Sequence, residues 1–218
     1  MLHFPWSMKK YNYRKSRLKA LLSGLLSLAM IAAGVALIAS FFFAGNLGSL
    51  ATNSDDPGGF NVPNLGSGEA VSGGPEDKTL RLTIPAMSRV EDAVVPTVPG
   101  SDVEALDSHK AIHLEGTGFP WEQEANVYIA GHRLGYPGTD SFLAFYDLDK
   151  LEDGDKVYVT DANGTTYTYE VFREFVVDPS NLSVTKPIPG KNILTLQTCT
   201  LPDYSQRIIV QAELVDVS

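Results

Sequence analysis

Near its C-terminus the chain contains the stretch Ile193-Leu194-Thr195-Leu196-Gln197-Thr198-Cys199-Thr200-Leu201-Pro202-Asp203-Tyr204-Ser205-Gln206-Arg207-Ile208-Ile209-Val210. Two runs rich in β-branched and aliphatic residues, 193–198 and 208–215, flank a segment broken by Pro202 and Asp203. Residues of the first kind favour strands, and those of the second kind favour turns. The stretch therefore predicts a β-hairpin whose strands are joined by a seven-residue loop, 200–206.

Side chains alternate between the two faces of a strand, so each run divides into an apolar face and a more polar face. Cys199, the only cysteine of the chain, falls on the polar face of the first run, and Arg207 falls on the polar face of the second. If the strands pair around the loop, these two residues lie opposite each other, with Cβ atoms about 5 Å apart. A permanent cation beside a thiol favours the thiolate, which is the nucleophilic form.

The alternative is that Cys199 has no chemical role. A single cysteine at a strand end is more often a small buried hydrophobe. The polar face and the facing Arg207 favour a reactive role, and they do not exclude the inert one.

The charges of the chain are segregated. Residues 1–19 hold six of the 17 Lys and Arg residues and no acidic residue, so 11 basic residues remain against 26 acidic ones in the rest of the chain, a net charge of −15. Binding to nucleic acid needs clustered cations that contact phosphates. An acidic body therefore argues against a nucleic-acid partner.

Residues 20–44 contain no charged side chain. As a helix this run would extend about 37 Å, enough to cross a hydrocarbon core of about 30 Å. The basic block 1–19 precedes it, and the positive-inside rule then places the N-terminus in the cytoplasm and the rest outside the cell membrane. The alternative is a cleaved signal peptide, whose apolar region is usually shorter. The length of this run and its Phe41-Phe42-Phe43 end favour an uncleaved single-pass anchor.

Residues 45–78 are rich in glycine and nearly without aliphatic periodicity, which predicts a flexible linker. Residues 79–218 form the predicted folded domain. Besides the closing pair of strands, strand-like runs occur at 80–84, 93–95, 126–132, 156–160 and 165–177, with the hairpin signal Asn163-Gly164 between the last two. About eight short strands with little helix predict one all-β sandwich or barrel.

Two short helices are expected within this domain. Ser101-Asp102-Val103-Glu104 has the Ser-x-x-Glu pattern of a capping box and predicts a helix that runs towards His109. Residues 141–151 offer several large apolar side chains for packing and also predict a short helix.

A thiolate that attacks an acyl group needs a proton donor for the leaving amine, and histidine is the usual donor. Of the four histidines, His3 precedes the apolar run, His109 and His113 lie near a predicted helix end, and His132 ends a predicted strand before a loop rich in glycine and proline. A strand-end residue beside a loop is well placed for a groove. His132 is therefore the candidate, and His109 and His113 are expected to be surface or packing residues.

Three of these features together resemble the sortase family of membrane-anchored cysteine transpeptidases. They are Thr195-Leu196-Gln197-Thr198-Cys199, an arginine (Arg207) that opens the next strand, and the upstream segment Ile129-Ala130-Gly131-His132-Arg133. The combination is specific, whereas Thr-Cys alone would be weak. The resemblance covers about Thr79 to Val217, and the predicted membrane anchor agrees with it.

The resemblance implies an all-β, eight-stranded sortase-type β-barrel with short helices, whose groove binds a Leu-Pro-x-Thr-Gly sorting signal. It implies that Cys199 attacks the Thr–Gly carbonyl and forms a thioacyl enzyme. His132 would protonate the departing amine and later deprotonate the incoming one, and Arg207 would hydrogen-bond the substrate and steady the oxyanion. Thr198 is implied as a substrate-binding residue of the oxyanion pocket. We expect no cofactor and no metal.

The implied partners are secreted proteins bearing a C-terminal sorting signal, a cell-wall precursor or pilin amine as acceptor, and the membrane. Gly131-His132-Arg133-Leu134-Gly135-Tyr136 and Leu201-Pro202-Asp203-Tyr204 resemble housekeeping-type members such as class E. Pilus-building members often carry an Asp-Pro-aromatic lid, whereas Asp56-Pro57 is followed here by Gly58. A pilin-polymerising sortase, a cysteine hydrolase and a non-catalytic tethered binding domain are the alternatives.

Overall fold

The computed structural model describes residues 62, 63, 65 and 73–218, which belong to one compact unit. The predicted cytoplasmic segment 1–19, the predicted anchor 20–44 and most of the predicted linker 45–78 lie outside the described residues. Among the residues that are described, no helix is both long enough and apolar enough to cross a bilayer.

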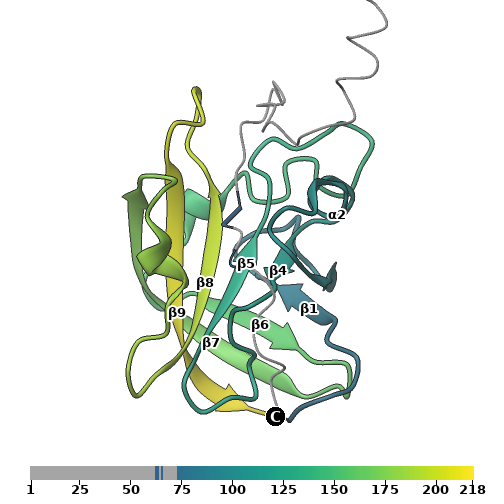
Figure 1. The fold of residues 1–218 in the computed structure, drawn as a ribbon, viewed down its shortest axis with the longest axis vertical. Coiled ribbons are helices and arrows are strands. Elements are labelled where there is room, and N and C mark those ends of the chain that lie inside the picture. The colour runs from purple at the N-terminus through teal and green to yellow at the C-terminus, as the bar shows by residue number, and fades with distance from the viewer. Residues whose placement is uncertain (1–61, 64, 66–72) are drawn as a thin grey trace, which may run out of the picture. The chain divides into compact units, whose positions relative to one another are not determined.

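Within the described residues, nine strands form one sheet (Figure 1). They are β1 (Leu80–Thr83), β2 (Ala93–Val95), β3 (Thr97–Val98), β4 (Ile112–Leu114), β5 (Ala125–Ala130), β6 (Lys156–Thr160), β7 (Thr166–Val177), β8 (Asn192–Cys199) and β9 (Arg207–Val217). Their order in the sheet is β2-β1-β6-β7-β9-β8-β5-β4-β3. The pairs β3–β4 and β5–β8 are parallel, and the remaining pairs are antiparallel.

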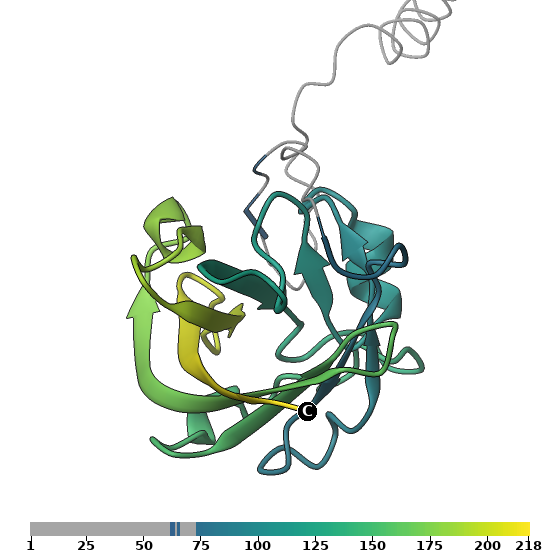
Figure 2. The same cartoon turned by 90° about the horizontal axis from the view of Figure 1, so that it is seen from below.

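The two strands at the ends of this order, β2 and β3, are separated in the chain by Pro96 alone. Proline has no backbone N–H to donate to a ladder, so the strand is interrupted there. Before Pro96 the chain pairs with β1, and after it with β4, where the Pro96 carbonyl accepts a hydrogen bond from the His113 amide at 2.9 Å. This switch bends the sheet into a nearly closed barrel, as Figure 2 shows. If β2 and β3 are counted as one strand interrupted at Pro96, the sheet has the predicted eight strands.

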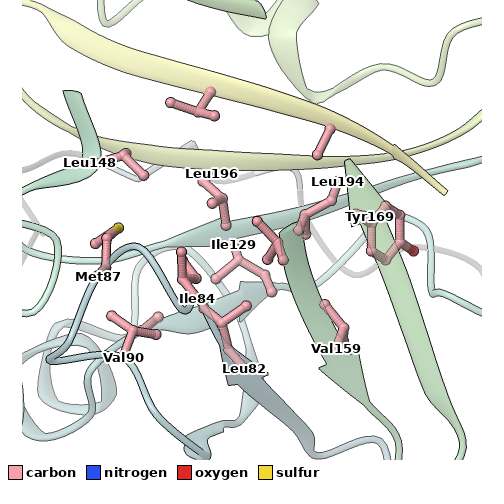
Figure 3. Packing of buried hydrophobic residues seen from close by; sticks show 14 of the residues in the cluster. Leu82, Ile84, Met87, Val90, Ile129, Leu148, Val159, Tyr169, Leu194 and Leu196 are labelled. Carbon is pink, nitrogen blue, oxygen red and sulfur yellow. The ribbon is translucent and has the colours of Figure 1, made fainter. Parts of the chain in front are cut away.

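One face of the sheet encloses the larger of the two apolar clusters among the described residues (Figure 3). Figure 3 labels its members Leu82, Ile84, Met87, Val90, Ile129, Leu148, Val159, Tyr169, Leu194 and Leu196. Ile208 and Val210 of β9 also belong to it, whereas Cys199 and Ile209 belong to the other cluster. The alternation predicted for the closing strands is therefore confirmed.

The smaller cluster lies on the opposite face of the sheet, over β4, β5 and β8. Its buried members are Val62, Leu106, Ile112, Leu114, Tyr128, Ala130, Val184, Cys199 and Ile209. Leu106 comes from helix α2 (Val103–Ser108), and Val184 from the 3-10 helix η2 (Leu182–Thr185). Val62 of the predicted linker is 8% exposed, so this part of the chain packs on the same face of the sheet as Cys199.

Two predicted hairpins are confirmed. Strands β6 and β7 pair antiparallel, and Gly164 in the turn has a φ of 88°, a conformation that glycine adopts without steric cost. Strands β8 and β9 pair antiparallel around residues 200–206, and the Thr200 amide donates to the Gln206 carbonyl at 3.0 Å to close the loop.

The helix predicted over 141–151 does not form. The segment is a series of turns that ends in the 3-10 helix η1 (Leu148–Lys150). Leu143 has a φ of 55°, which a right-handed helix does not allow. The amides of Leu143 and Phe145 donate instead to the carbonyls of Leu134 and His132, at 2.8 and 3.0 Å. At these two amides tertiary hydrogen bonds therefore take the place of helical ones, and they fix the backbone around His132.

The other predicted helix forms as α2, but its cap differs from the prediction. The N-cap residue is Asp102, whose carboxylate accepts a hydrogen bond from the Ala105 amide at 2.9 Å, and Ser101 lies one residue outside. Aspartate accepts this bond as well as serine does, so the capping-box pattern located the helix and missed its first residue by one position.

Candidate active site

Cys199 and Arg207 lie directly opposite each other where β8 and β9 open into their loop. Both are on the face of the hairpin that the smaller apolar cluster covers, and both are nearly buried, at 1% and 2% exposure. Side chains of directly opposite residues in an antiparallel pair are neighbours on one face. The predicted register, in which Cys199 and Arg207 face each other across the ladder, is confirmed.

The loop holds the Arg207 side chain in place. One of its terminal nitrogens, Nη1, donates to the backbone carbonyls of Tyr204 and Gln206 at 2.9 and 3.0 Å. The φ of Tyr204 is 56°, so its backbone is in the left-handed region, which non-glycine residues adopt uncommonly. The guanidinium has five N–H donors in a planar fork, so it can be anchored through one nitrogen and present other donors elsewhere.

His132 follows the end of β5, after Gly131. The Gly131 amide donates to the Gln197 carbonyl of β8 at 3.1 Å, so the residue before the histidine is tied to the strand that carries Cys199. A β-carbon on Gly131 would lie 2.8 Å from the Lys110 carbonyl oxygen and 2.9 Å from the Phe145 ring. Only glycine fits where the backbone approaches Lys110 and Phe145 this closely. The absence of a side chain at Gly131 therefore lets the backbone just before His132 pack tightly against its neighbours.

A pocket of about 260 Å³ brings the predicted nucleophile and the predicted proton donor together. Its lining residues are His132, Arg133, Leu134, Gly135, Tyr136, Pro137, Cys199 and Tyr204. Most of the lining comes from the loop after β5, and the remainder from the β8–β9 hairpin. A hollow of about 600 Å³ elsewhere, lined in part by Arg89, Lys110 and Asp140, contains none of the predicted site residues.

Sequence reasoning missed a carboxylate in contact with His132. Asp107 of α2 places Oδ1 2.9 Å from His132 Nε2, and the two side chains are 31% and 4% exposed. An aspartate 25 positions upstream in a helix carries no local signal for this contact. It arises because α2 packs across the face of the sheet that also holds Cys199.

Arg133 is a further residue whose contacts the sequence did not predict. It belongs to the segment 129–133, and no role was predicted for it. Its Nη1 donates to the Cys199 carbonyl at 3.4 Å, and its Nη2 forms an ion pair with Asp149 of η1. The side chain is 12% exposed. Arg133 therefore connects the backbone of the cysteine to η1, and it adds a second guanidinium to the surroundings of Cys199.

Tyr136 packs its ring edge-on against the His132 imidazole, with centroids 5.7 Å apart and an interplanar angle of 84°. Tyr136 and Tyr204 both line the pocket. These two aromatic side chains give the pocket apolar walls close to the histidine and the cysteine.

Thr198 is fully buried, and its hydroxyl donates to the Gly131 carbonyl at 2.8 Å. This bond crosses from β8 to the residue before His132. The substrate contact implied for Thr198 stays a prediction, and the structure adds that its side chain links β8, which carries Cys199, to the residue before His132.

The other described histidines have structural partners, as expected. The His109 ring Nδ1 donates to the Ala105 carbonyl at 2.9 Å at the end of α2. His113 in β4 is fully buried, and its Nε2 donates to the Gly118 carbonyl at 3.0 Å. Burial lowers the pKa of His113 to about 4, so its ring is neutral at pH 7. Among the residues that the structure describes, no three His, Cys, Asp or Glu side chains are grouped to hold a metal ion.

The arrangement combines a buried thiol, an imidazole in the same pocket and an anchored arginine that pairs with the cysteine across the ladder. Such a set can supply a nucleophile, a proton carrier and a donor for a developing oxyanion. On a nearly closed β-barrel, this is the kind of arrangement that cysteine-dependent acyl transfer requires.

A family model described as the sortase domain matches residues 82–215, and the chain belongs to the sortase family. Sortase A of Streptococcus agalactiae serotype III is 41% identical over 90 residues, which cover 41% of this chain and 36% of that protein. Sortase SrtE1 of Streptomyces coelicolor is 31% identical over 140 residues, 57% of this chain and 38% of that protein. The chain thus matches little more than a third of the length of these curated relatives.

Solved structures show the same fold. The Group B Streptococcus Pilus Island 1 Sortase C2 superposes with a TM-score of 0.56 at 30% identity, over 66% of this chain and 77% of that chain. Sortase A from Corynebacterium diphtheriae superposes with a TM-score of 0.54 at 31% identity, over 65% of this chain and 62% of that chain.

Proposed function

We propose that this chain is a membrane-anchored cysteine transpeptidase that cleaves a Leu-Pro-x-Thr-Gly-like sorting signal between Thr and Gly. It then joins the new acyl end to an amine of the cell envelope. The observation that carries the proposal is that Cys199 and His132 line one pocket while Arg207 stands opposite Cys199.

In the first step the Cys199 thiolate attacks the Thr–Gly carbonyl carbon and a carbon–sulfur bond forms. Negative charge develops on the carbonyl oxygen, and Arg207 donates to it, with Thr198 contributing to the same oxyanion pocket. The carbon–nitrogen bond then breaks, and the His132 imidazolium gives its proton to the departing amine. The acyl group remains on Cys199 as a thioester.

In the second step an amine from the acceptor attacks the thioester. His132, now neutral, takes the proton that the amine loses, and the sulfur leaves as a thiolate. The enzyme returns to its starting protonation state, and a new amide bond replaces the one that was cleaved. Tyr136 and Tyr204 line the pocket. We expect their rings to limit the access of water to the thioester, which would favour an amine as acceptor.

The proposal includes residues 20–44 as a single-pass anchor in the cell membrane, with 1–19 in the cytoplasm and the catalytic domain 79–218 outside. The uncharged run and the basic block before it support this arrangement. Protease added to intact cells should digest the domain and spare the N-terminal segment. Protection of the domain in intact cells would contradict the arrangement.

The reaction is tested with the purified full chain in detergent, a Leu-Pro-x-Thr-Gly peptide and an added glycine-type amine. Transfer predicts that the amine-ligated peptide becomes the main product when the amine is in excess. A cysteine hydrolase would give the free acid alone under the same conditions, and that result would overturn the proposal of transfer while it kept Cys199 as nucleophile.

A pilin amine is the second candidate acceptor, because one of the similar solved structures is a Pilus Island 1 Sortase C2. Competition between a glycine-type α-amine and a lysine ε-amine distinguishes the two. Preference for the α-amine supports cell-wall anchoring, and preference for the ε-amine supports pilin polymerisation.

A further inference from the structure

The ion pair between Asp107 and His132 is built into the fold. His132 is 4% exposed and its Nε2 lies 2.9 Å from Asp107 Oδ1, although the residues are 25 positions apart. A carboxylate accepts hydrogen bonds and does not donate them, so the bond requires a hydrogen on Nε2. The contact therefore fixes both the orientation of the ring and the nitrogen that carries the hydrogen.

Helix α2 holds the carboxylate at this distance, because both of its ends and its middle are fixed. Asp102 caps the first turn through the Ala105 amide. Leu106, next to Asp107, is 3% exposed and packs in the cluster that contains Cys199. At the other end the His109 amide and ring both donate to the Ala105 carbonyl, at 3.1 and 2.9 Å.

We propose that Asp107 is a positioning residue that keeps the hydrogen of the neutral His132 ring on Nε2 and pairs with the imidazolium. Nδ1 is then the nitrogen that exchanges a proton with Cys199 and with the substrate amines. This inference rests on the proposed function, and it adds an acidic residue to a site whose predicted catalytic residues are Cys199, His132 and Arg207.

The proton path follows from this assignment. The thiol proton of Cys199 passes to Nδ1, which leaves a thiolate and an imidazolium. When the scissile carbon–nitrogen bond breaks, the Nδ1 proton passes to the leaving amine, and in the second step Nδ1 takes a proton from the incoming amine. The Nε2 hydrogen stays between the ring and Asp107 throughout, so Asp107 neither gains nor loses a proton.

The charges around His132 explain why a carboxylate matters there. The titratable and charged groups that contact it or line its pocket are Asp107 from α2, Arg133 and Tyr136 from the loop after β5, and Cys199 and Tyr204 from the β8–β9 hairpin. Arg207 faces Cys199 across the ladder. Arg133 and Arg207 carry guanidiniums, and a cation disfavours a second cation nearby. Asp149 pairs with Arg133, and Asp107 supplies the negative charge in contact with the imidazole.

The first test compares Asp107→Asn with the wild-type full chain in detergent, using peptide and amine as substrates. The variant loses the charged acceptor that orients the ring and pairs with the imidazolium, so its effect should fall on kcat and not on KM. We expect kcat at pH 7.5 to fall about tenfold or more with KM changed less than twofold, and Asp107→Glu to recover part of the loss.

Glu104→Gln is the matched control, because Glu104 is an exposed carboxylate in the first turn of the same helix and is not part of the proposed positioning contact. It should leave kcat close to that of the wild type, whereas Asp107→Asn should lower it. An unchanged kcat in Asp107→Asn, or an equal loss in both variants, would reduce Asp107 to a structural residue and overturn the inference.

The tautomer is measured independently of activity. The chain has four histidines, so 15N-histidine NMR of the full chain, with the His132→Gln variant to assign the signal, reports on the neutral His132 ring. The inference predicts hydrogen on Nε2 in the wild type and a mixture of tautomers in Asp107→Asn. Hydrogen on Nδ1 in the wild type would overturn it. If no peptide is turned over, this measurement still tests the inference, and only the proposed function fails.

Discussion

Arg207 is anchored by the loop that it follows, and it faces Cys199 directly across the β8–β9 ladder. The loop carbonyls of Tyr204 and Gln206 hold one nitrogen of the guanidinium, so the planar group is oriented before any substrate binds. A preoriented donor stabilises a developing charge without a cost of reorganisation at the moment of reaction. This pairing is the geometric basis of the first prediction.

Arg207→Lys is expected to lower kcat/KM on the order of 100-fold, the usual effect of losing an oxyanion donor. Lysine keeps the positive charge, but its ammonium cannot hold the loop carbonyls and donate to a substrate in the same planar geometry. Steady-state kinetics with a sorting-signal peptide measure the effect. Arg81→Lys, at an exposed arginine of β1 paired with Asp92, is the control and should keep wild-type activity. Wild-type kinetics in Arg207→Lys would remove Arg207 from the site.

Thr198→Val tests the link between β8 and the residue before His132. Valine has a similar shape but cannot donate to the Gly131 carbonyl, which would stay buried without this bond. We expect a loss of about 1 kcal/mol in the free energy of unfolding and a clear fall in kcat, because His132 is less well placed. Thr198→Ser keeps the hydroxyl and should retain most of the stability and most of kcat.

The matched control for this variant is Thr195→Val on the same strand. Thr195 is also fully buried and lies away from the pocket. Its hydroxyl donates to Asn126 Oδ1 at 2.7 Å and accepts from Gln211 Nε2 at 3.0 Å. Thr195→Val should therefore cost at least as much stability as Thr198→Val and leave kcat nearly unchanged. If both variants lose kcat equally, the effect of Thr198 is one of general stability.

The buried His113 should make the free energy of unfolding depend on pH. Burial lowers its pKa in the folded state to about 4, against 6.5 for an ordinary histidine. Between these values the unfolded chain binds a proton that the folded chain does not, so stability falls as the pH falls from 6.5 to 4, by on the order of 3 kcal/mol in total. Urea unfolding at pH 7.5 and pH 5 should show about 2 kcal/mol of this loss.

His113→Gln separates this contribution from that of the carboxylates. The variant is expected to be less stable at pH 7.5, since it loses hydrogen bonds in β4, but its stability should change less between pH 7.5 and pH 5. An equal change in the variant and the wild type would show that His113 does not titrate in this range.

The features that the sequence predicted correctly are those decided over a few residues. The alternation in 193–198 and 208–215 predicted which side chains enter the barrel, and with the loop length it predicted that Cys199 faces Arg207. Asn163-Gly164 predicted the β6–β7 hairpin in the same way. Local backbone preferences and period-2 patterns are enough for such features.

The features that were missed depend on contacts between distant segments. The Asp107–His132 pair exists because α2 lies over the sheet, and the predicted helix 141–151 is lost because Leu143 and Phe145 donate to the loop after β5. Strand β3 has only two residues and pairs with β4 after the break at Pro96, so its local pattern was too short to recognise. Tertiary context decides each of these.

The most direct test of the central claim is the intact mass of the full chain after brief incubation with a Leu-Pro-x-Thr-Gly peptide and without an acceptor amine. The account predicts that the wild type gains the mass of the acyl fragment, that hydroxylamine removes it as expected for a thioester, and that Cys199→Ala gains nothing while its thermal unfolding stays close to that of the wild type. Peptide cleavage by Cys199→Ala at the wild-type rate, or an adduct that persists in that variant, would contradict the account.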